Sequence, residues 1–231
     1  QYLSWDSRSK KVQSINVNRI AKGRPPLPTK QVRAEILPAK ETILSELIHV
    51  MDDIEIIQRP SGKYDETQID YTLNSVLYEV PKLPDNTIKG VITSPPYCNR
   101  YDYTRTYALE LVFLGINECG IKKMRQDLLS CTVENKSKIT HLRKFYNKIG
   151  HSERFDYIYK TIQSNKTFSE IIRALSERKA HGDLNNNGVI RMVEGYFTEL
   201  AFLYAELYRV CKPGAMVAFV NDNVRYGGEI I

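Results

Sequence analysis

Two adjacent prolines at the end of a β-branched run constrain the fold of this chain more than any other feature. The run IKGVITS, residues 88–94, predicts a strand, and Pro95, Pro96 and Tyr97 follow it directly. Proline lacks the backbone N–H that a strand ladder needs, and it restricts the residue before it. The strand must therefore end in a stiff, extended segment, which is where open α/β sheets place their ligands.

The segments around this strand predict an α/β fold with a parallel sheet. Ile69, Tyr71 and Leu73 alternate as in a short strand, and SVLYEVPKL predicts one or two helical turns that close at Pro81. With the strand at 88–94, this gives a strand–helix–strand unit. Near the end of the chain, residues 189–211 predict a long helix, residues 212–215 a turn and residues 216–221 a further strand of the same sheet.

Three regions are expected from these patterns. Residues 1–68 form an N-terminal arm and helix: Lys22–Lys30 contains three prolines, residues 38–57 have apolar residues at helical spacing, and GKYDETQ predicts a loop. Residues 69–115 and 191–231 form the core, which includes a helix that ends at Gly115. Residues 116–190 are a helical insertion between the two parts of the core.

The net positive charge lies entirely in this insertion. Residues 116–190 carry 14 Lys/Arg and 8 Asp/Glu, whereas the rest of the chain carries 19 of each sign, which together give the net charge of +6. A basic segment on a neutral scaffold indicates either a polyanionic partner or an ordinary solvated helical surface. No apolar run reaches the roughly 18 residues of a membrane span.

The cysteines and histidines argue against metal chemistry. The four cysteines have no CxxC spacing and the four histidines have no HExxH pattern. The cysteines are therefore interpreted as reduced thiols of a cytoplasmic protein, with no metal site.

Ser94, Pro95, Pro96 and Tyr97 combine hydrogen-bond acceptors with an aromatic face, without a strong base or a paired nucleophile. Such a set suits an exocyclic amino group on a nucleobase. Acceptors that hold its N–H bonds favour tetrahedral nitrogen, so that the lone pair can attack a methyl sulfonium. Stacking holds the base and contributes roughly 1–3 kcal/mol. A base within a duplex would have to be flipped out.

The segments ITSPPY, LNSVLYEVPKLPDNTIKG and ELYRVCKPGAMVAFVND together resemble amino-group DNA methyltransferases of the N4-cytosine/N6-adenine class. The resemblance covers about residues 69–231. It implies a Rossmann-like, S-adenosylmethionine-dependent methyltransferase sheet, incomplete here, with a helical insertion that serves as a target-recognition region. It also implies a site-specific enzyme of a bacterial or archaeal modification system, associated with the nucleoid. The serine in the motif favours N4-cytosine over N6-adenine.

The same resemblance assigns roles to individual residues. Ser94 and Pro95 would hold the amino group, Pro96 would complete the rigid mount, and Tyr97 would stack on the base. The cofactor contacts would come from Asn74, Ser75 and Thr93, although the family often has an acidic residue at the position of Ser75. The residues suited to DNA phosphates or bases are Arg100, Tyr103, Arg105, Asn221 and Asn223. For Arg100 and Arg105, ion pairing with Asp102 and Glu110 is an equal alternative.

One departure from the family concerns the cofactor. The family's glycine-rich loop, aromatic-x-Gly-x-Gly after the first strand, is absent, and neither Ser61–Lys63 nor the YGG at residues 226–228 replaces it. We therefore expect the chain to be the catalytic part of a longer enzyme. Its partners would be double-stranded DNA, the cofactor-binding part of the same protein and a restriction endonuclease. An RNA or protein-amide methyltransferase and a non-catalytic DNA-binding module with a decayed cofactor site remain open alternatives.

Overall fold

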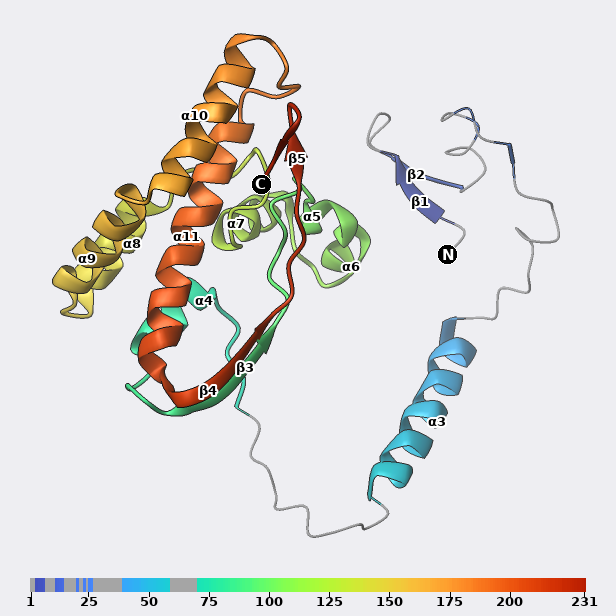
Figure 1. The fold of residues 1–231 in the computed structure, drawn as a ribbon. Coiled ribbons are helices and arrows are strands. Elements are labelled where there is room, and N and C mark those ends of the chain that lie inside the picture. The colour runs from blue at the N-terminus through green and yellow to red at the C-terminus, as the bar shows by residue number, and fades with distance from the viewer. Residues whose placement is uncertain are drawn as a thin grey trace. The chain divides into compact units, whose positions relative to one another are not determined.

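The computed structural model describes residues 3–6, 11–14, 20, 23, 25–26, 39–58 and 70–231 (Figure 1). The chain divides into two compact units, Gln1–Asp70 and Tyr71–Ile231. Within the described parts of the chain, no helix combines the length and the apolar character that a bilayer span requires.

The first unit contains a hairpin and a long helix. Strands β1 (Leu3–Asp6) and β2 (Lys11–Ser14) pair antiparallel, which the polar sequence did not predict. Helix α3 (Ala39–Gln58) confirms the helix predicted from apolar spacing. Its apolar residues are largely exposed, and Met51 is 67% exposed. Most of the expected arm, Lys22–Lys30, and the whole expected loop at 62–68 lie outside the described residues.

The second unit contains the predicted parallel strand pair. Strand β3 (Ile88–Thr93) pairs with β4 (Cys211–Phe219) in parallel, with Gly90 opposite Met216 and Thr93 opposite Phe219. The turn expected at residues 212–215 is an irregularity inside β4. Ile88 pairs with Cys211, and the register then shifts to Met216. Gly214 supplies a φ of +80° there, which a residue with a Cβ rarely adopts.

The strand predicted at residues 69–73 is wrong. Residue 69 lies outside the described residues, and residues 70–75 form no strand. Tyr71 is 90% exposed and Leu73 is 99% exposed, so the alternating side chains have nothing to pack against. Both partners of the parallel pair instead come from later in the chain. A wider, Rossmann-like sheet stays a prediction, because the described residues contribute two strands to the parallel sheet.

The helices follow the sequence closely. Helix α4 (Val76–Glu79) and a 3-10 turn, η1 (Val80–Lys82), confirm the predicted helical turns, which end at Lys82, one residue after the predicted Pro81. The helix expected to end at Gly115 is divided at Tyr107 into α5 (Tyr103–Thr106) and α6 (Ala108–Phe113), and Gly115 has a φ of +79°. The insertion contains the expected helices α7 (Glu118–Asp127), α8 (Ile139–Lys148), α9 (Ser152–Gln163) and α10 (Lys166–Ala180).

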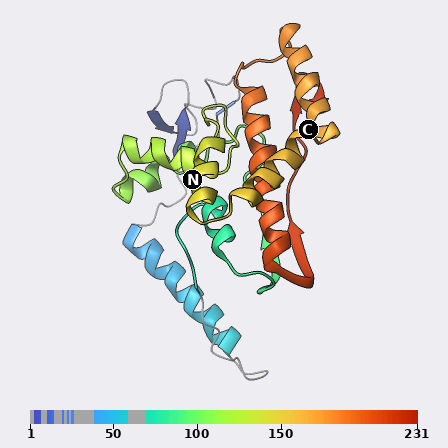
Figure 2. The same ribbon diagram turned by 90° about the vertical axis from the view of Figure 1, so that its left-hand side faces the viewer.

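Helix α11 (Val189–Val210) is the centre of the hydrophobic core. It lies between the helices α8–α10 and the β3–β4 pair (Figures 1 and 2). Its buried apolar residues recur every three or four positions, so one continuous stripe faces the neighbouring helices. The buried core residues of α11 are Val189, Met192, Val193, Tyr196, Leu200, Phe202, Leu203, Leu207 and Val210.

Two buried glutamates of α11 carry ion pairs. The ammonium of Lys138 lies 2.9 Å and 3.1 Å from the two carboxylate oxygens of Glu199, and both side chains are almost fully buried. Glu206 accepts hydrogen bonds from Tyr146, Arg154 and Arg209. These groups fix the insertion and the end of α11 to each other.

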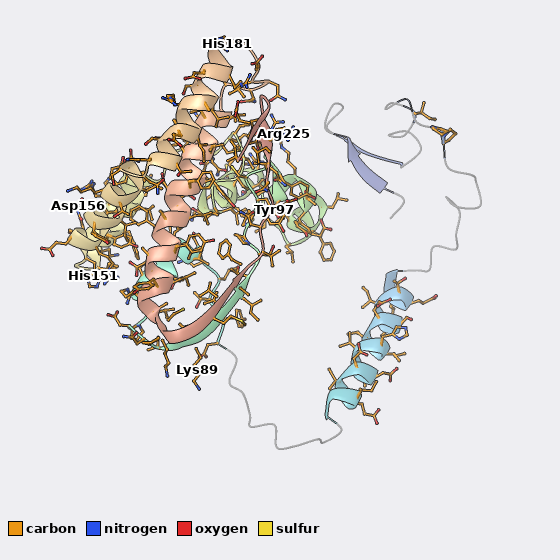
Figure 3. The ribbon with its side chains drawn as sticks, in the orientation of Figure 1. Lys89, Tyr97, His151, Asp156, His181 and Arg225 are labelled. Carbon is orange, nitrogen blue, oxygen red and sulfur yellow. The ribbon has the colours of Figure 1, made fainter. Side chains whose placement is uncertain are left out.

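A short hairpin ends the second unit. Strands β5 (Arg225–Tyr226) and β6 (Glu229–Ile230) pair antiparallel. In Figure 3, Arg225 on this hairpin and Tyr97 lie toward the same end of the unit, and Lys89 lies at the other end. The carboxyl ends of the two parallel strands therefore face the region of the hairpin.

Candidate active site

The Ser-Pro-Pro-Tyr segment begins where the strand ladder stops. The Thr93 carbonyl accepts the last ladder bond, 2.9 Å from the Val220 amide nitrogen. Among the described residues, no hydrogen bond uses the carbonyls of Ser94, Pro95 or Pro96. The prolines have no N–H to donate, so the segment is extended without a ladder of its own. Three carbonyls in succession therefore have no hydrogen-bond partner among the described residues.

The residues of this segment differ in burial, and Ser94 is the most exposed of the four. Pro95 is buried, Pro96 and Tyr97 are partly buried, and Ser94 is exposed. The buried proline fixes the backbone from inside, while the hydroxyl of Ser94 remains accessible. Directly after the segment, the Tyr97 carbonyl accepts a hydrogen bond from the Asn99 amide at 2.8 Å.

A cavity of about 370 Å³ lies beside Ser94. Its lining is mostly apolar and aromatic and comes from the segment itself, from α5 and α6, and from the end of α7. The lining residues are Ser94, Pro96, Tyr103, Thr104, Tyr107, Leu111, Met124 and Leu128. A cavity of this size is within the range of small-ligand sites, and aromatic and apolar walls are those that hold flipped bases.

The aromatic walls of this cavity come from a cluster of tyrosines. The rings of Tyr103 and Tyr107 are nearly parallel, at 9°, with centroids 6.5 Å apart. Tyr101 meets Tyr103 edge to face at 5.0 Å. Burial is the largest cause that raises the pKa of Tyr103 above its ordinary value, so its hydroxyl is neutral at physiological pH. Tyr97 does not line this cavity.

Asp102 holds the start of α5, and so positions the cavity wall. It is buried and caps the helix, accepting hydrogen bonds from the amide and the hydroxyl of Thr104 at 3.0 Å and 2.6 Å. Its other oxygen lies 2.9 Å from Nε of Arg125 and 3.2 Å from Nε of Arg105. Arg105 also pairs with Glu134 at 2.7 Å. The ion pair between Arg105 and Asp102, expected as an alternative to DNA contact, is thus present.

The remaining residues expected at DNA differ in their surroundings. Arg100 donates to the Asn185 carboxamide oxygen at 2.7 Å. Asn221 donates to the Tyr196 hydroxyl at 3.1 Å. Asn223 is exposed. Tyr103 lies beside Ser94, whereas Asn221 and Asn223 lie after β4. Contact of any of these residues with DNA stays a prediction.

Contact of Asn74, Ser75 and Thr93 with the methyl donor stays a prediction, and the structure shows the local partners of these residues. The Asn74 carboxamide is occupied, because its nitrogen bonds Glu79 and its oxygen accepts the Ser75 amide hydrogen bond at 2.8 Å. Thr93 lies at the end of β3, and no hydrogen bond joins its side chain to Asn74 or Ser75 within the described residues.

The sequence did not single out Tyr107, Met124 and Leu128 as site residues. Tyr107 follows Tyr103 by four residues, a helical spacing that puts the two rings on one face, so this signal was present. Met124 and Leu128 come from the end of α7 in the insertion, and only the tertiary structure brings them to Ser94.

Comparison with known proteins shows similarity to type II methyltransferases. The chain is 49% identical over 234 residues to the type II methyltransferase M.BsoBI of Geobacillus stearothermophilus, which covers 100% of this chain and 45% of that protein. It is 36% identical over 231 residues to the type II methyltransferase M.AvaI of Nostoc sp. and of Anabaena variabilis, which covers 99% of this chain and 43% of those proteins. The chain therefore spans less than half the length of these relatives. No protein-family model and no solved structure matches it.

Proposed function

We propose that this chain, similar along its whole length to part of two type II methyltransferases, is the catalytic part of a DNA methyltransferase. The reaction transfers a methyl group from S-adenosylmethionine to the exocyclic amino group of a flipped base, with N4 of cytosine favoured over N6 of adenine. The observation that supports this most is the run of three unused carbonyls next to the exposed Ser94 hydroxyl and the aromatic cavity.

The contribution of the chain to this reaction is positioning. An exocyclic amino group has two N–H groups. One donates a hydrogen bond to the Ser94 hydroxyl oxygen, and the other donates to the Pro95 carbonyl oxygen. These two hydrogen bonds direct the nitrogen lone pair away from the ring plane, toward the methyl group. S-adenosylmethionine would supply the electrophilic methyl group on its sulfonium sulfur. As the nitrogen–carbon bond formed, the carbon–sulfur bond would break to leave a neutral thioether, and the base nitrogen would release one N–H proton to solvent. Holding the reactants in line supplies much of the rate enhancement.

The aromatic groups hold the base while this occurs. Tyr97 stacks on one face of the base, as expected from the motif, and the cavity walls at Tyr103 and Tyr107 offer further faces. Stacking on an aromatic side chain contributes roughly 1–3 kcal/mol per base, which helps to offset the cost of unstacking from the duplex. The mostly apolar walls also keep water from competing for the amino hydrogens.

The duplex is held by the basic insertion. Lys122 and Lys123 on α7 and Lys136 in the loop after α7 are exposed. Lys122 and Lys123 directly precede Met124, which lines the cavity. Lysines near the cavity bind phosphates without regard to sequence, which gives affinity and salt dependence. The enzyme would belong to a modification system, with an endonuclease that recognises the same site as its partner.

The test is product analysis with the full-length protein that contains this chain. Duplex DNA is incubated with the protein and S-adenosylmethionine, and mass spectrometry of the nucleosides identifies the methylated base. We expect N4-methyldeoxycytidine. Ser94→Ala should lower the rate by about 100-fold or more, the scale seen when one preorganised contact to a reacting group is removed. Ser45→Ala, an exposed serine of α3, is the matched control and should keep the wild-type rate.

The outcomes separate the alternatives. A Ser94→Ala variant with the wild-type rate would refute the proposed mechanism. Tight binding of DNA without any methylated nucleoside would favour a non-catalytic DNA-binding module. Preference for structured RNA over duplex DNA in a competition assay would change the substrate class and keep the chemistry.

A further inference from the structure

The hairpin at the end of the chain is built for a fixed shape. Gly227 and Gly228 form its two-residue turn with φ values of +57° and +93°, which two-residue hairpins of the tightest type require. Beyond the two strands, Val224 and Ile231 exchange a pair of backbone hydrogen bonds at 3.1 Å and 2.8 Å. The hairpin therefore holds its side chains in defined positions.

One side chain of the hairpin reaches the backbone just after the Ser-Pro-Pro-Tyr segment. Tyr226 is buried, and its hydroxyl donates a hydrogen bond to the Cys98 carbonyl at 2.5 Å. Burial raises the pKa of Tyr226 well above its ordinary value, so the phenol keeps the proton that it donates. The guanidinium of Arg100 lies 5.6 Å from the centre of the Tyr226 ring, a cation–π contact.

The loop itself needs this outside support. Arg100 has a φ of +64°, a strained conformation for a residue with a Cβ, which persists only where surrounding contacts determine it. Pro95 and Pro96 have no N–H to donate, so the local hydrogen bonds of the loop begin only at Asn99, whose amide donates to the Tyr97 carbonyl. The long-range bond from Tyr226 thus fixes the chain one residue after Tyr97.

The hairpin is fixed at its other strand to the insertion. Glu229 accepts hydrogen bonds from Arg178 of α10, with its oxygen 2.8 Å from Nε and 2.7 Å from a terminal nitrogen. A Cβ placed on Gly227 would come within 3.1 Å of both Arg178 and Leu184, so the turn lies directly against the end of α10 and the loop after it. The hairpin therefore joins the insertion to the loop that carries Tyr97.

We propose that Tyr226 is a positioning residue for methyl transfer: its hydroxyl holds the Cys98 carbonyl, and thereby sets the position of Tyr97 and of the carbonyls before it. This inference rests on the proposed function. A displacement of about 1 Å at reacting groups can cost about 100-fold in rate. Loss of a single hydrogen bond next to the Ser-Pro-Pro-Tyr segment should therefore lower the reaction rate more than it lowers the stability of the fold. The role belongs to the phenolic hydroxyl, because the ring alone would fill the same space.

The test compares Tyr226→Phe with Tyr208→Phe in the full-length protein. Tyr226→Phe keeps the ring and its contact with Arg100 but removes the donor. Tyr208 is 89% exposed on α11 and provides the matched control. We expect Tyr226→Phe to lower the single-turnover methylation rate about tenfold, which corresponds to about 1.4 kcal/mol, with the Kd for duplex DNA unchanged within about twofold. Tyr208→Phe should leave both quantities at the wild-type values.

Different results identify which idea is wrong. If the wild-type protein methylates DNA and Tyr226→Phe has the same rate per folded molecule, the positioning role is refuted and the proposed function stands. A lower melting temperature with an unchanged rate shows a structural role and also refutes it. A wild-type protein that forms no methylated nucleoside refutes the proposed function itself.

A second variant keeps the test decisive if Tyr226→Phe does not fold. Glu229→Gln removes the charge that pairs with Arg178 at a partly exposed position, and leaves the core intact. It loosens the hairpin from α10, so we expect a single-turnover rate about twofold to fivefold lower at unchanged DNA affinity. An unchanged rate in that variant contradicts the proposal.

Discussion

Removal of the Lys138 ammonium is the sharpest test of how the insertion is attached to the core. Lys138 lies 2.9 Å from Glu199 and donates to the Ser130 hydroxyl at 2.7 Å, and the Ser130 amide donates to Glu199 at 2.9 Å. All three residues are buried. Lys138→Met keeps much of the side-chain volume but leaves a carboxylate in the interior without its counter-ion. Loss of one partner of a buried pair costs about 3–5 kcal/mol, so we expect a loss of that size in the free energy of unfolding.

The assay is urea denaturation of the full-length protein at neutral pH, measured by circular dichroism. Lys136→Met is the matched control, because Lys136 is two residues away and exposed, and its effect should stay within about 0.5 kcal/mol. Lys138→Met combined with Glu199→Gln should recover about 2 kcal/mol, since the buried charge is gone and the amide oxygen still accepts from Ser130. A loss below about 1 kcal/mol for Lys138→Met, or no recovery in the double variant, would refute the reasoning.

Three further changes test separate features. Thiol labelling of the native protein at mildly alkaline pH should modify the exposed Cys119 and spare Cys98, because burial raises the pKa of the Cys98 thiol to about 12. Peptide mass spectrometry measures the labelling of each cysteine, and equal labelling of both would contradict the prediction. Asp102→Ala should lower the free energy of unfolding by about 3 kcal/mol or more, since it removes the cap of α5 and the buried carboxylate that pairs with Arg125, and urea denaturation measures the loss. Gly227→Ala should cost roughly 1–2 kcal/mol, because the turn needs a positive φ, and an unchanged melting temperature would argue against the hairpin geometry.

The sequence predicted the parts of the fold that local patterns determine. Apolar spacing located α3, segments rich in helix-forming residues indicated the helices of the insertion, and the β-branched run located β3. The end of a helix was predicted at Gly115; α6 ends at Phe113, and Gly115, two residues later, has the positive φ that glycine adopts after helix ends. In each case the physical cause lies within a few residues of the element.

The features that the sequence missed depend on distant partners. The alternation of Tyr71 and Leu73 predicted a strand, but alternation gives a strand only where another strand supplies hydrogen bonds and a core covers one face. The double glycine at 227–228 was considered only as a cofactor loop, although it is a strong signal for a tight hairpin. The bond between Tyr226 and Cys98 joins residues 128 positions apart and has no local signal.

The candidate site likewise has one part that could be predicted from the sequence and one part that depends on distant residues. The Ser-Pro-Pro-Tyr segment could be located from the sequence, because prolines leave carbonyls without local partners whatever the surroundings. The cavity could be anticipated only in part. Tyr103 was named as a contact residue, whereas Met124 comes from an insertion whose docking on the strand end could not be derived from local patterns.

The start of the strand that leads to this site is held by the end of α11. The Asn86 amide donates to the Arg209 carbonyl at 3.1 Å, and the Thr87 amide donates to the Val210 carbonyl at 2.8 Å. The guanidinium of Arg209 also donates to the Leu83 carbonyl at 2.8 Å. These bonds fix the turn before β3, so the position of Ile88 depends on the last turn of α11.

The other end of the same strand is held by residues after β4. Val220 closes the ladder at Thr93, and Tyr226 fixes the Cys98 carbonyl. Residues 209–226 therefore hold β3 and its Ser-Pro-Pro-Tyr segment from both sides, although they come from the far end of the chain. Because the two prolines leave the segment without bonds of its own, its geometry is set by these neighbours. Substitutions in the last residues of this chain should thus alter the rate of the proposed methyl transfer more than changes at exposed positions on the helices of the insertion.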